Sequence, residues 1–479
     1  MNETTPALID GKPVTTSETS EVHSPYDGSI IGSVPACGTG EIDHAVSVAK
    51  ERLVADDLPA HERAAILDRV AAALVERLDE FTASISGEAA KPVVAAKVEA
   101  ERAVDTLRFS AAAARTLTGE MIAMDASSAG EGMLGFVSRV PIGVVAGISP
   151  FNFPLNLVCH KIAPAVAAGA PIVLKPASAT PLTALRIAAL FEECGLPPGW
   201  INVVTCDGAT AGHLVKHPDV AMITFTGSGP VGWGIRADAP KKRVGLELGN
   251  NAPLIIEADA DLERAAERIV AGGFSFSGQS CISVQRVYAQ SEIYDELADA
   301  VASRVEGLGV GDPSDPATTV SSLINDSAGK RVSAWIDEAV DAGAKVLGQA
   351  PLPSPSGSGP RNLIAPTVLG EITADMKVSS EEVFGPVIGM ARYETLDDAI
   401  ALANDTRYGL QAGIFTSDLA KAIRATRQLH FGGVVVNEAP AYRTDQQPYG
   451  GVKDSGNTRE GPAYAVREMT EQRAVMIRP

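Results

Sequence analysis

The chain has 479 residues, a formal net charge of −19 and a hydrophobic content of 45%. A chain of this length is too long to fold around a single hydrophobic core, so two or more domains are expected. The acidic charge argues against nucleic acid as a partner, because a phosphate backbone is bound by a basic surface. No apolar run reaches the roughly 18 residues that span a bilayer, and residues 1–5 do not resemble a signal peptide, so no membrane partner is expected.

The five cysteines, at positions 37, 159, 194, 206 and 281, are scattered and include no C-x-x-C pair. Their odd number and their spacing argue against a disulfide framework or a zinc site. The pattern favours a reducing compartment, and we expect a cytoplasmic protein that binds no metal.

Helices are expected over residues 41–118, where apolar residues recur at intervals of three and four. Strands and helices alternate after this region. In chain order the prediction is strand 140–148, helix 161–168, strand 170–175, helix 182–194, strand 201–204 and strand 221–225. Alternation at this spacing predicts βαβ units with a parallel sheet, which is an α/β fold.

A second α/β series begins near residue 250. It is predicted to contain strand 252–256, helix 262–271 and strand 284–289, and an exposed loop rich in Pro, Ser and Gly follows at 351–360. Two segments fit neither series and are expected to form a small β element for subunit contacts. The predicted division is 1–122 with 142–249 as the first domain, 250–450 as the second, and 123–141 with 451–479 as the bridging β element.

Cys281 lies in a turn rich in Gly, Ser and Gln, whereas a cysteine that only packs prefers apolar surroundings. Packing is still the commoner role of a free cysteine. Glu247, in the segment GLELG, and Asn152, in SPFNFP, add a carboxylate and an amide donor. A thiol, a carboxylate and an amide are the groups needed for acyl chemistry through a covalent intermediate.

Glycines at 227, 229 and 232 follow a predicted strand and open a predicted helix, in the G-x-G-x-x-G pattern of a dinucleotide site. A helix start that merely needs glycine is the alternative. Glu247 lies twenty positions after Gly227, where that pattern places a ribose-binding acid. Because Glu247 ends one α/β unit and begins the next, we expect it instead to face the cleft between domains as a general base.

Lys175 closes a predicted buried strand. A lysine at the carboxyl end of a parallel strand points toward the ligand crevice of an α/β sheet, although a solvated lysine is the alternative. Together with the preceding segments it completes a series that resembles the aldehyde dehydrogenase superfamily over essentially the whole chain. The segments are SPFNFP at 149–154, LKPA at 174–177, FTGS at 225–228, ELG at 247–249, GQSC at 278–281, EEVFGP at 381–386 and PYGGVKDSG at 448–456.

The resemblance implies a Rossmann-like cofactor domain, a catalytic domain and a β oligomerisation element, in a homodimer or homotetramer. It also implies that Cys281 attacks the aldehyde, while the Asn152 amide and the Cys281 backbone N–H hold the oxyanion. Hydride then passes to NAD or NADP, and Glu247 activates the water that hydrolyses the thioester. A close alternative is a member that transfers the acyl group to coenzyme A. A second alternative is a binding or structural protein that has the same fold but no catalytic activity.

The resemblance further implies a set of cofactor contacts, in which Lys175 holds the adenosine ribose and Glu382 the nicotinamide ribose. The predicted cofactor-binding residues are Ile148, Phe151, Lys175, Ser178, Gly208, Phe225, Gly227, Ser228, Val231, Leu248, Glu382 and Phe384. Two positions depart from the family pattern: Asn250 follows Gly249 where a second glycine is frequent, and Ser178 stands where NAD-preferring members often carry Glu. A serine there does not repel a 2′-phosphate, so NADP is expected to be accepted.

By the same resemblance, a tunnel to Cys281 is expected to be lined by Arg102, Phe153, Asn156, His160, Ser280, Ile282 and Tyr442. Its polar and cationic members predict a small aldehyde with an anionic or hydroxylated end. Phosphonoacetaldehyde, succinate semialdehyde, lactaldehyde and glyceraldehyde 3-phosphate all satisfy this description. The alternative for Arg102 is a salt bridge to Glu99 or Asp105, each three residues away. Arg443 is a further candidate cation.

Overall fold

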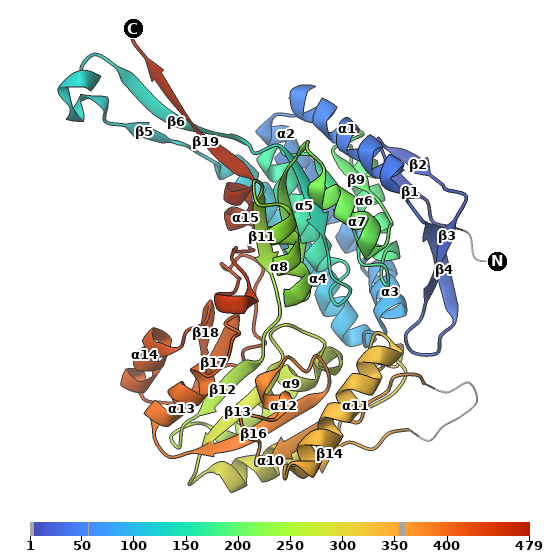
Figure 1. The fold of residues 1–479 in the computed structure, drawn as a ribbon, viewed down its shortest axis with the longest axis vertical. Coiled ribbons are helices and arrows are strands. Elements are labelled where there is room, and N and C mark those ends of the chain that lie inside the picture. Colours follow the sequence, from blue (N-terminus) through green and yellow to red (C-terminus); the bar gives the residue numbers. More distant parts are fainter. Residues whose placement is uncertain (1–3, 56, 354–359) are drawn as a thin grey trace.

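The computed structural model describes residues 4–55, 57–353 and 360–479, and it contains two α/β bodies, one above the other in Figure 1. The upper body is built on a seven-stranded sheet of order β11-β10-β7-β8-β9-β1-β2. Its parallel strands are β7 (Val144–Ile148), β8 (Ile172–Lys175), β9 (Ile201–Val203), β10 (Val220–Thr226) and β11 (Arg243–Glu247). The short strands β1 (Ala7–Ile9) and β2 (Lys12–Val14) extend one edge in antiparallel pairing. The α/β fold predicted from the sequence is confirmed.

Helices cover both faces of this sheet. They are α1 (Thr39–Ala55), α2 (Ala60–Glu76), α3 (Leu78–Ala89), α4 (Val93–Thr116), α5 (Asn156–Ala168), α6 (Leu182–Glu193), α7 (Gly208–Lys216) and α8 (Gly229–Asp238). The long helical region predicted at 41–118 is therefore four helices. Pro59 and Pro92 stand at the N-caps of α2 and α4, because proline lacks the amide hydrogen that a helix interior requires but a helix start does not.

The lower body contains a second seven-stranded sheet, of order β14-β15-β16-β13-β12-β17-β18. Its strands are β12 (Ala252–Ile256), β13 (Val284–Gln290), β14 (Lys345–Gln349), β15 (Thr367–Gly370), β16 (Val387–Tyr393), β17 (Gln411–Phe415) and β18 (Gly433–Val436). All of them run parallel except β14. Its helices are α9 (Leu262–Phe274), α10 (Tyr294–Glu306), α11 (Asp326–Asp341), α12 (Lys377–Ser380), α13 (Leu396–Asn404) and α14 (Leu419–Gln428). In the loop predicted at 351–360, residues 351–353 are exposed and 354–359 lie outside the described residues.

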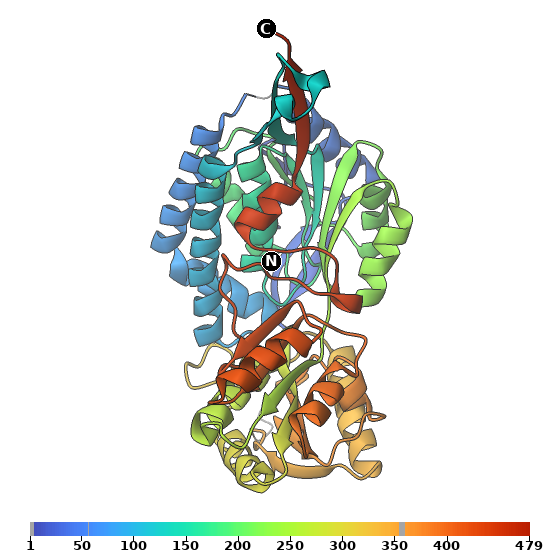
Figure 2. The same cartoon turned by 90° about the vertical axis from the view of Figure 1, so that its left-hand side faces the viewer.

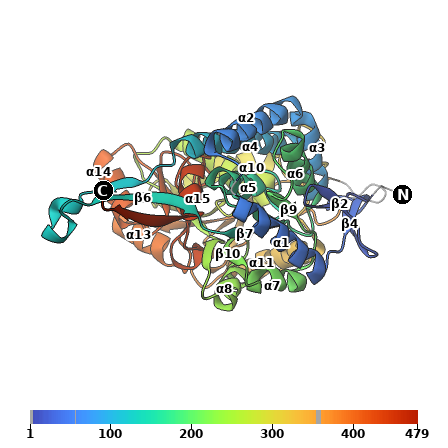
Figure 3. The ribbon, with the colours of Figure 1, turned by 90° about the horizontal axis from the view of Figure 1, so that it is seen from above.

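A three-stranded antiparallel sheet projects from the upper body as an arm that ends in the C-terminus (Figures 1 and 3). It consists of β5 (Glu120–Ile122), β6 (Leu134–Pro141) and β19 (Thr470–Ile477). The single strand predicted at 140–148 is wrong, since its first residues end β6 and the others form β7. Gly143, at φ +135°, turns the chain between the two sheets, in a conformation that other residues rarely adopt.

Not all of the C-terminal segment belongs to the arm. Helix α15 (Pro462–Glu468) packs against α4 and α5 of the upper body, as seen in Figure 2. A separate hairpin of β3 (Thr19–His23) and β4 (Ile30–Pro35) lies near the N-terminus. The C-terminal segment thus brings the residues between 440 and 460 to the junction of the two bodies, where they meet the ends of the strands.

Candidate active site

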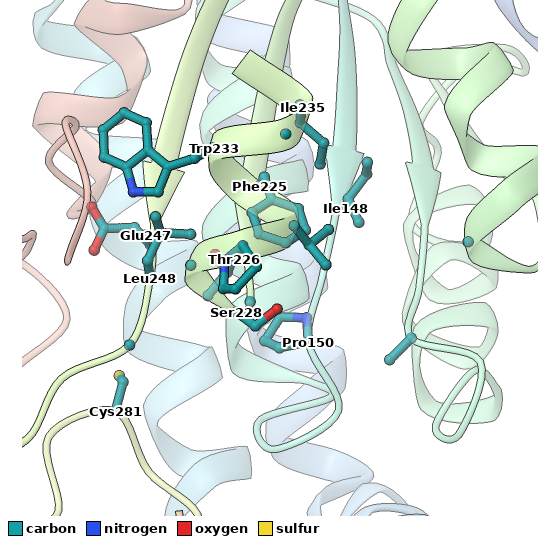
Figure 4. A pocket seen from close by; sticks show the side chains of 18 of the residues that line it. Ile148, Pro150, Phe225, Thr226, Ser228, Trp233, Ile235, Glu247, Leu248 and Cys281 are labelled. Carbon is teal, nitrogen blue, oxygen red and sulfur yellow. The ribbon is translucent and has the colours of Figure 1, made fainter. Parts of the chain in front are cut away.

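A cavity of about 960 Å³ lies at the carboxyl ends of the parallel strands of the upper sheet and reaches into the lower body (Figure 4). Open α/β sheets bind their ligands at this edge. The lining includes Asn152 and Glu247 from the upper body and Cys281 from the lower one. The three residues predicted to be catalytic are thus brought to one cavity from positions far apart in the sequence.

The loop that carries Cys281 has an unusual backbone. Phe276, Ser277 and Gly278 are three consecutive residues with φ between +49° and +69°. Such a conformation costs about 1–3 kcal/mol for a residue other than glycine and persists only where the surroundings impose it. Here the Ser277 hydroxyl donates to the Ser321 carbonyl at 2.7 Å and accepts from the Ser321 amide at 3.0 Å. The loop therefore presents Cys281 in a fixed position before β13 begins.

The Cys281 sulfur lies 2.8 Å from the Tyr449 hydroxyl, and the residue is half-buried. Burial raises the pKa of the Cys281 thiol to about 12, while the hydrogen bond with Tyr449 and the Arg443 guanidinium act to lower it. The nearby carboxylates of Glu382 and Glu247 act in the same direction as burial. A reactive thiolate here depends on the two favourable neighbours, because the thiolate is the nucleophilic form.

Asn152 follows β7 and its side chain is buried. Its amide nitrogen donates to the Gln279 carbonyl at 3.0 Å, two residues before Cys281. An amide carries two N–H groups, so the second remains to bind a further acceptor. The contact holds a hydrogen-bond donor beside the sulfur, as an oxyanion site requires.

Glu247 is the last residue of β11, and it lies beside Thr226 of β10 in the parallel register. The side chain is buried, and neither carboxylate oxygen has a hydrogen-bond partner in the part of the chain that the structure describes. Burial, and then the Glu460 carboxylate, raise the pKa of Glu247 well above its usual value. In Figure 4 the carboxylate points away from Cys281, and its Oε1 lies against Gly450 of the C-terminal segment.

The glycine pattern forms the start of α8, with Ser228 at the N-cap and Gly229 as the first helical residue. A side chain at Gly229 would meet nothing within 4 Å, whereas one at Gly232 would overlap the Leu248 side chain. Gly232 therefore allows the helix to pack closely on the chain after β11. The free N-terminal amides and the helix dipole of α8 at the cavity favour a bound anion such as a pyrophosphate.

The other end of the cavity carries Lys175, the last residue of β8. Its ammonium donates to the Ser178 hydroxyl at 3.3 Å, and that hydroxyl donates to the Cys206 carbonyl at 3.3 Å. Burial lowers the pKa of the Lys175 ammonium. Gly208 lines the same cavity. A side chain placed at Gly208 would meet nothing within 4 Å, so the cavity has open space there. The remaining N–H groups of Lys175 are donors and the Ser178 oxygen is an acceptor, and this pair next to open space fits the hydroxyl groups of a ribose.

Glu382 lies in the cavity wall that belongs to the lower body. Its carboxylate accepts a hydrogen bond from the Asn250 amide at 2.9 Å, and burial raises the pKa of Glu382 to about 7. The Asn250 side chain donates to the Gln411 carbonyl at 3.1 Å. Asn250, which departs from the family pattern, thus links the segment between β11 and β12 to β17 through its side chain. Its backbone amide still donates a hydrogen bond to Glu382.

Phe384, at φ +48°, faces Phe151 across the cavity with the rings edge to face and their centroids 5.9 Å apart. All twelve residues predicted to bind the cofactor line this one cavity. They are Ile148, Phe151, Lys175, Ser178, Gly208, Phe225, Gly227, Ser228, Val231, Leu248, Glu382 and Phe384.

The model of the aldehyde dehydrogenase family matches residues 14–475. The chain belongs to the aldehyde dehydrogenase family. It is 43% identical over 471 residues to the 3-sulfolactaldehyde dehydrogenase of Priestia aryabhattai, an alignment that covers 98% of this chain and 97% of that relative.

Two solved structures extend the comparison. Aldehyde dehydrogenase 21 from Physcomitrella patens, in complex with the reaction product succinate, has a TM-score of 0.96 and 38% identity, over 100% of this chain and 99% of that one. The NADP-dependent glyceraldehyde-3-phosphate dehydrogenase of Bacillus halodurans C-125, complexed with NADP, has a TM-score of 0.94 and 36% identity, over 99% of both chains. This aldehyde dehydrogenase therefore uses NAD or NADP to oxidise an aldehyde.

The seven residues predicted to line the aldehyde tunnel lie outside the lining of this cavity. Three of them converge on the buried carboxylate of Asp445. Arg102 of α4 donates to both of its oxygens, at 2.9 and 3.1 Å. Asn156 donates to Oδ1 at 2.9 Å, and His160 Nε2 lies 3.0 Å from the same atom. Although burial acts to raise it, the hydrogen bond from His160 and the charge of Arg102 lower the pKa of Asp445.

The alternative in which Arg102 forms a salt bridge with Glu99 or Asp105 is wrong. Glu99 pairs instead with the buried ammonium of Lys91 at 2.5 Å and accepts hydrogen bonds from the first amides of α5. Asp105 lies 3.7 Å from Arg108. Arg102 turns to the C-terminal segment because that segment packs across α4 and brings a buried carboxylate within reach.

The remaining four tunnel candidates lie in different environments. The ammonium of Lys91 lies 3.7 Å from the Phe153 ring centroid. Ile282 packs with Tyr449 and partly buried Cys281, and Ser280 is half-buried one position before the thiol. Tyr442 is exposed, and its carbonyl accepts a hydrogen bond from Gln411. Ser280 and Ile282 therefore lie beside the thiol, and Phe153 shares the Lys91 ammonium with Phe276 of the Cys281 loop.

Sequence reasoning missed a buried polar network behind the thiol. Arg443 donates to Glu460 at 3.0 Å, its guanidinium lies 3.7 Å above the Tyr449 ring, and Lys161 lies 3.7 Å from Glu460. Tyr449 stands in the PYGG segment, which could have signalled it. Asp445 and Glu460 stand in no motif, and their partners lie as far as 343 residues away in the sequence.

The described residues also bear on metal binding and on membrane insertion. Among residues 4–55, 57–353 and 360–479, no group of three or more His, Cys, Asp or Glu side chains is placed to hold a metal ion. Over the same ranges, no helix combines the length and the apolar character needed to cross a membrane.

Proposed function

We propose that this aldehyde dehydrogenase oxidises a small aldehyde with an anionic end, of the 3-sulfolactaldehyde or succinate semialdehyde type, to the carboxylic acid. The observation that carries the proposal is Arg443, a buried cation that acts on the Cys281 thiol. The relative from Priestia aryabhattai, which is named for 3-sulfolactaldehyde, and the solved structure with bound succinate support the same class of substrate.

Two buried polar atoms of the network lack a hydrogen-bond partner among the described residues: Arg443 Nε, which is a donor, and His160 Nδ1, which is an acceptor in a neutral imidazole whose Nε2–H faces Asp445. A buried donor without a partner costs about 1–3 kcal/mol. A sulfonate or carboxylate accepts several hydrogen bonds and would offset this cost on binding. Burial, followed by the charge of Arg443, lowers the pKa of His160, so the cation that serves the anion is Arg443 rather than the imidazole.

The chemical roles of the chain follow from the groups around the sulfur. The Cys281 thiolate adds to the aldehyde carbon, and the oxygen that becomes negative is held by the free Asn152 N–H and the Cys281 backbone amide. NAD or NADP, when bound, supplies the hydride acceptor. Glu247 then takes a proton from the water that attacks the Cys281 thioester. Because its carboxylate points away from the sulfur in Figure 4, this step requires rotation of the Glu247 side chain.

NADP is proposed to be accepted as well as NAD. The position beside Lys175 is occupied by the neutral hydroxyl of Ser178 rather than by a carboxylate, so no negative charge at residue 178 opposes a 2′-phosphate. Steady-state rates with each cofactor, measured with the same aldehyde, test this. Saturation with NADP supports the proposal, and activity with NAD alone contradicts it.

Replacement Arg443→Gln is expected to lower kcat/KM for succinate semialdehyde about 10-fold more than for lactaldehyde. Succinate semialdehyde carries an anionic end, whereas lactaldehyde is uncharged and serves as the comparison substrate. The ratio of the two values is the readout, since loss of Arg443 also weakens the nucleophile and lowers both. The matched control is Arg108→Gln, an exposed arginine on α4. Equal losses for both aldehydes would contradict a role for Arg443 in recognising the anion.

We further propose that the chain is a cytoplasmic homodimer or homotetramer. All five cysteines are free, which suits a reducing compartment. The arm exposes Met121, Ile122, Leu134, Met476 and Ile477, and β19 is one of the two edge strands of its sheet. Exposed apolar residues on both faces of the arm, beside an unpaired strand edge, favour association with a second copy.

The assembly is tested by sedimentation velocity. The native chain is expected to sediment as a dimer or tetramer, and the double variant Met121→Glu/Met476→Glu as a smaller species, because one charge on each face of the arm opposes burial of its apolar residues. A monomeric native chain at micromolar concentration would contradict the proposal.

A further inference from the structure

Tyr449 is the hydrogen-bond partner found for the Cys281 sulfur in the described residues, at 2.8 Å, and only 3% of it is exposed. Its position is fixed on three sides. Its backbone pairs with Glu460 through hydrogen bonds of 3.1 and 2.6 Å. The Arg443 guanidinium lies 3.7 Å above its ring, and Leu410 and Ile282 pack with it. The hydroxyl therefore cannot leave the sulfur without disturbing a packed and paired residue.

We propose that Tyr449 is a positioning residue that donates a hydrogen bond to the Cys281 thiolate, orienting the sulfur and stabilising its reactive form. The proposal rests on the proposed function, in that it concerns the nucleophile of the same reaction. A phenol is both donor and acceptor, so it can accept from the neutral thiol and donate to the thiolate by rotation of one hydroxyl hydrogen. A hydrogen bond to a charged acceptor is roughly twice as strong as a neutral one, so the contact favours the thiolate.

The surroundings of the sulfur show why such a donor matters. Glu382 and Glu247, from the lower and upper bodies, oppose a negative sulfur, and burial opposes it further. Arg443 favours the thiolate, and it does so from beyond the Tyr449 ring. Burial raises the pKa of Tyr449 well above its usual value, so the phenol keeps its proton. It remains a donor near neutral pH.

The contact is expected to serve both halves of the reaction. Before Cys281 adds to an aldehyde, the hydrogen bond raises the fraction of the sulfur that is present as the nucleophilic thiolate. When water releases the acid from the thioester, the sulfur leaves as a thiolate, and the same hydroxyl stabilises this leaving group. Removal of the hydroxyl should therefore slow attack on electrophiles in general, whether or not they are aldehydes.

The test is the rate at which iodoacetamide alkylates Cys281 in the cofactor-free protein, followed across pH by peptide mass so that the other four cysteines are counted separately. In Tyr449→Phe the alkylation rate near neutral pH is expected to fall about 10-fold, with its pH dependence displaced upward by about one unit. The sign follows from the chemistry of the contact: a lost donor destabilises the thiolate, so the thiol pKa rises. The acid limb of kcat/KM for aldehyde oxidation should move in the same direction.

The matched control is Tyr464→Phe, a tyrosine on α15 with 39% exposure, which should alkylate as the native chain does. The phenyl ring introduced by Tyr449→Phe keeps the packing with Leu410, and a thermal melt establishes that the variant is folded. Because iodoacetamide needs neither aldehyde nor cofactor, its result stands even if the proposed substrate class is wrong. Alkylation of Tyr449→Phe at the native rate, with the native pH dependence, would overturn the role of Tyr449.

Discussion

Replacement Cys281→Ser is expected to lower kcat for aldehyde oxidation by about 10⁴-fold or more. A serine hydroxyl ionises far less readily than a thiol, and Tyr449 and Arg443 cannot offset a difference of that size beside two carboxylates. Serine has nearly the volume of cysteine, so the strained loop and the cavity should keep their shape. The measurement is the rate of reduced nicotinamide formation with saturating aldehyde and NADP, together with a thermal melt that monitors folding.

The control for this replacement is Cys194→Ser, which changes a half-buried thiol at the end of α6, outside the cavity lining. This variant should retain native turnover. Native turnover in Cys281→Ser would refute covalent catalysis through this sulfur. Absence of any turnover in the native chain, with or without coenzyme A, would favour the binding or structural protein on the same scaffold.

Replacement Glu247→Gln is expected to leave the first turnover intact and to slow steady-state turnover by about 10² to 10⁴-fold, the usual contribution of a general base. The amide keeps the size of the carboxylate and cannot accept the proton of the attacking water. Rapid mixing with excess aldehyde and NADP should therefore show a burst of one reduced cofactor per active site, followed by a slow phase. An equal loss in the burst and in the steady state would place Glu247 before thioester formation.

The pH dependence of the slow phase gives the same assignment a second test. Burial raises the pKa of Glu247, and a general base acts in its deprotonated form. Hydrolysis by the native chain should therefore rise with pH through a value above the usual range for a glutamate, and Glu247→Gln should lack this rise. Coenzyme A should not restore turnover in the variant. If it does, the acyl-transferring alternative is the better description.

That the twelve candidate cofactor-binding residues line one cavity could be predicted from the sequence, because each depends on a short segment at the end of a strand. Lys175 closes β8, and the 227–232 glycine pattern joins β10 to α8, so the local sequence places both at the carboxyl edge of the sheet. The expectation that Glu247 faces the junction of the domains rested on the same reasoning, and the structure puts it in the cavity wall. Short sequence segments are enough to predict a residue's place in the cavity when that residue stands at the carboxyl end of a parallel strand, because the fold brings these ends together.

The environment of the aldehyde could not be predicted in this way. Arg102 meets Asp445 across 343 positions of sequence, and Tyr449 meets Cys281 across 168. These contacts depend on how the C-terminal segment crosses the junction of the two bodies, which no periodicity or motif encodes. The prediction of a cationic tunnel counted Arg102 and His160 as free charges. The structure pairs both with Asp445, and Arg443, itself paired with Glu460, is the cation whose charge acts on the Cys281 thiol.

The central claim is that the acyl group rests on Cys281 until Glu247 activates water. The intact mass of Glu247→Gln, measured shortly after mixing with succinate semialdehyde and NADP, tests it most directly. The predicted result is one added acyl group per chain, located on the peptide that contains Cys281 and missing when NADP is omitted. An unmodified protein that nonetheless forms reduced cofactor, or an acyl group on another residue, would contradict the account.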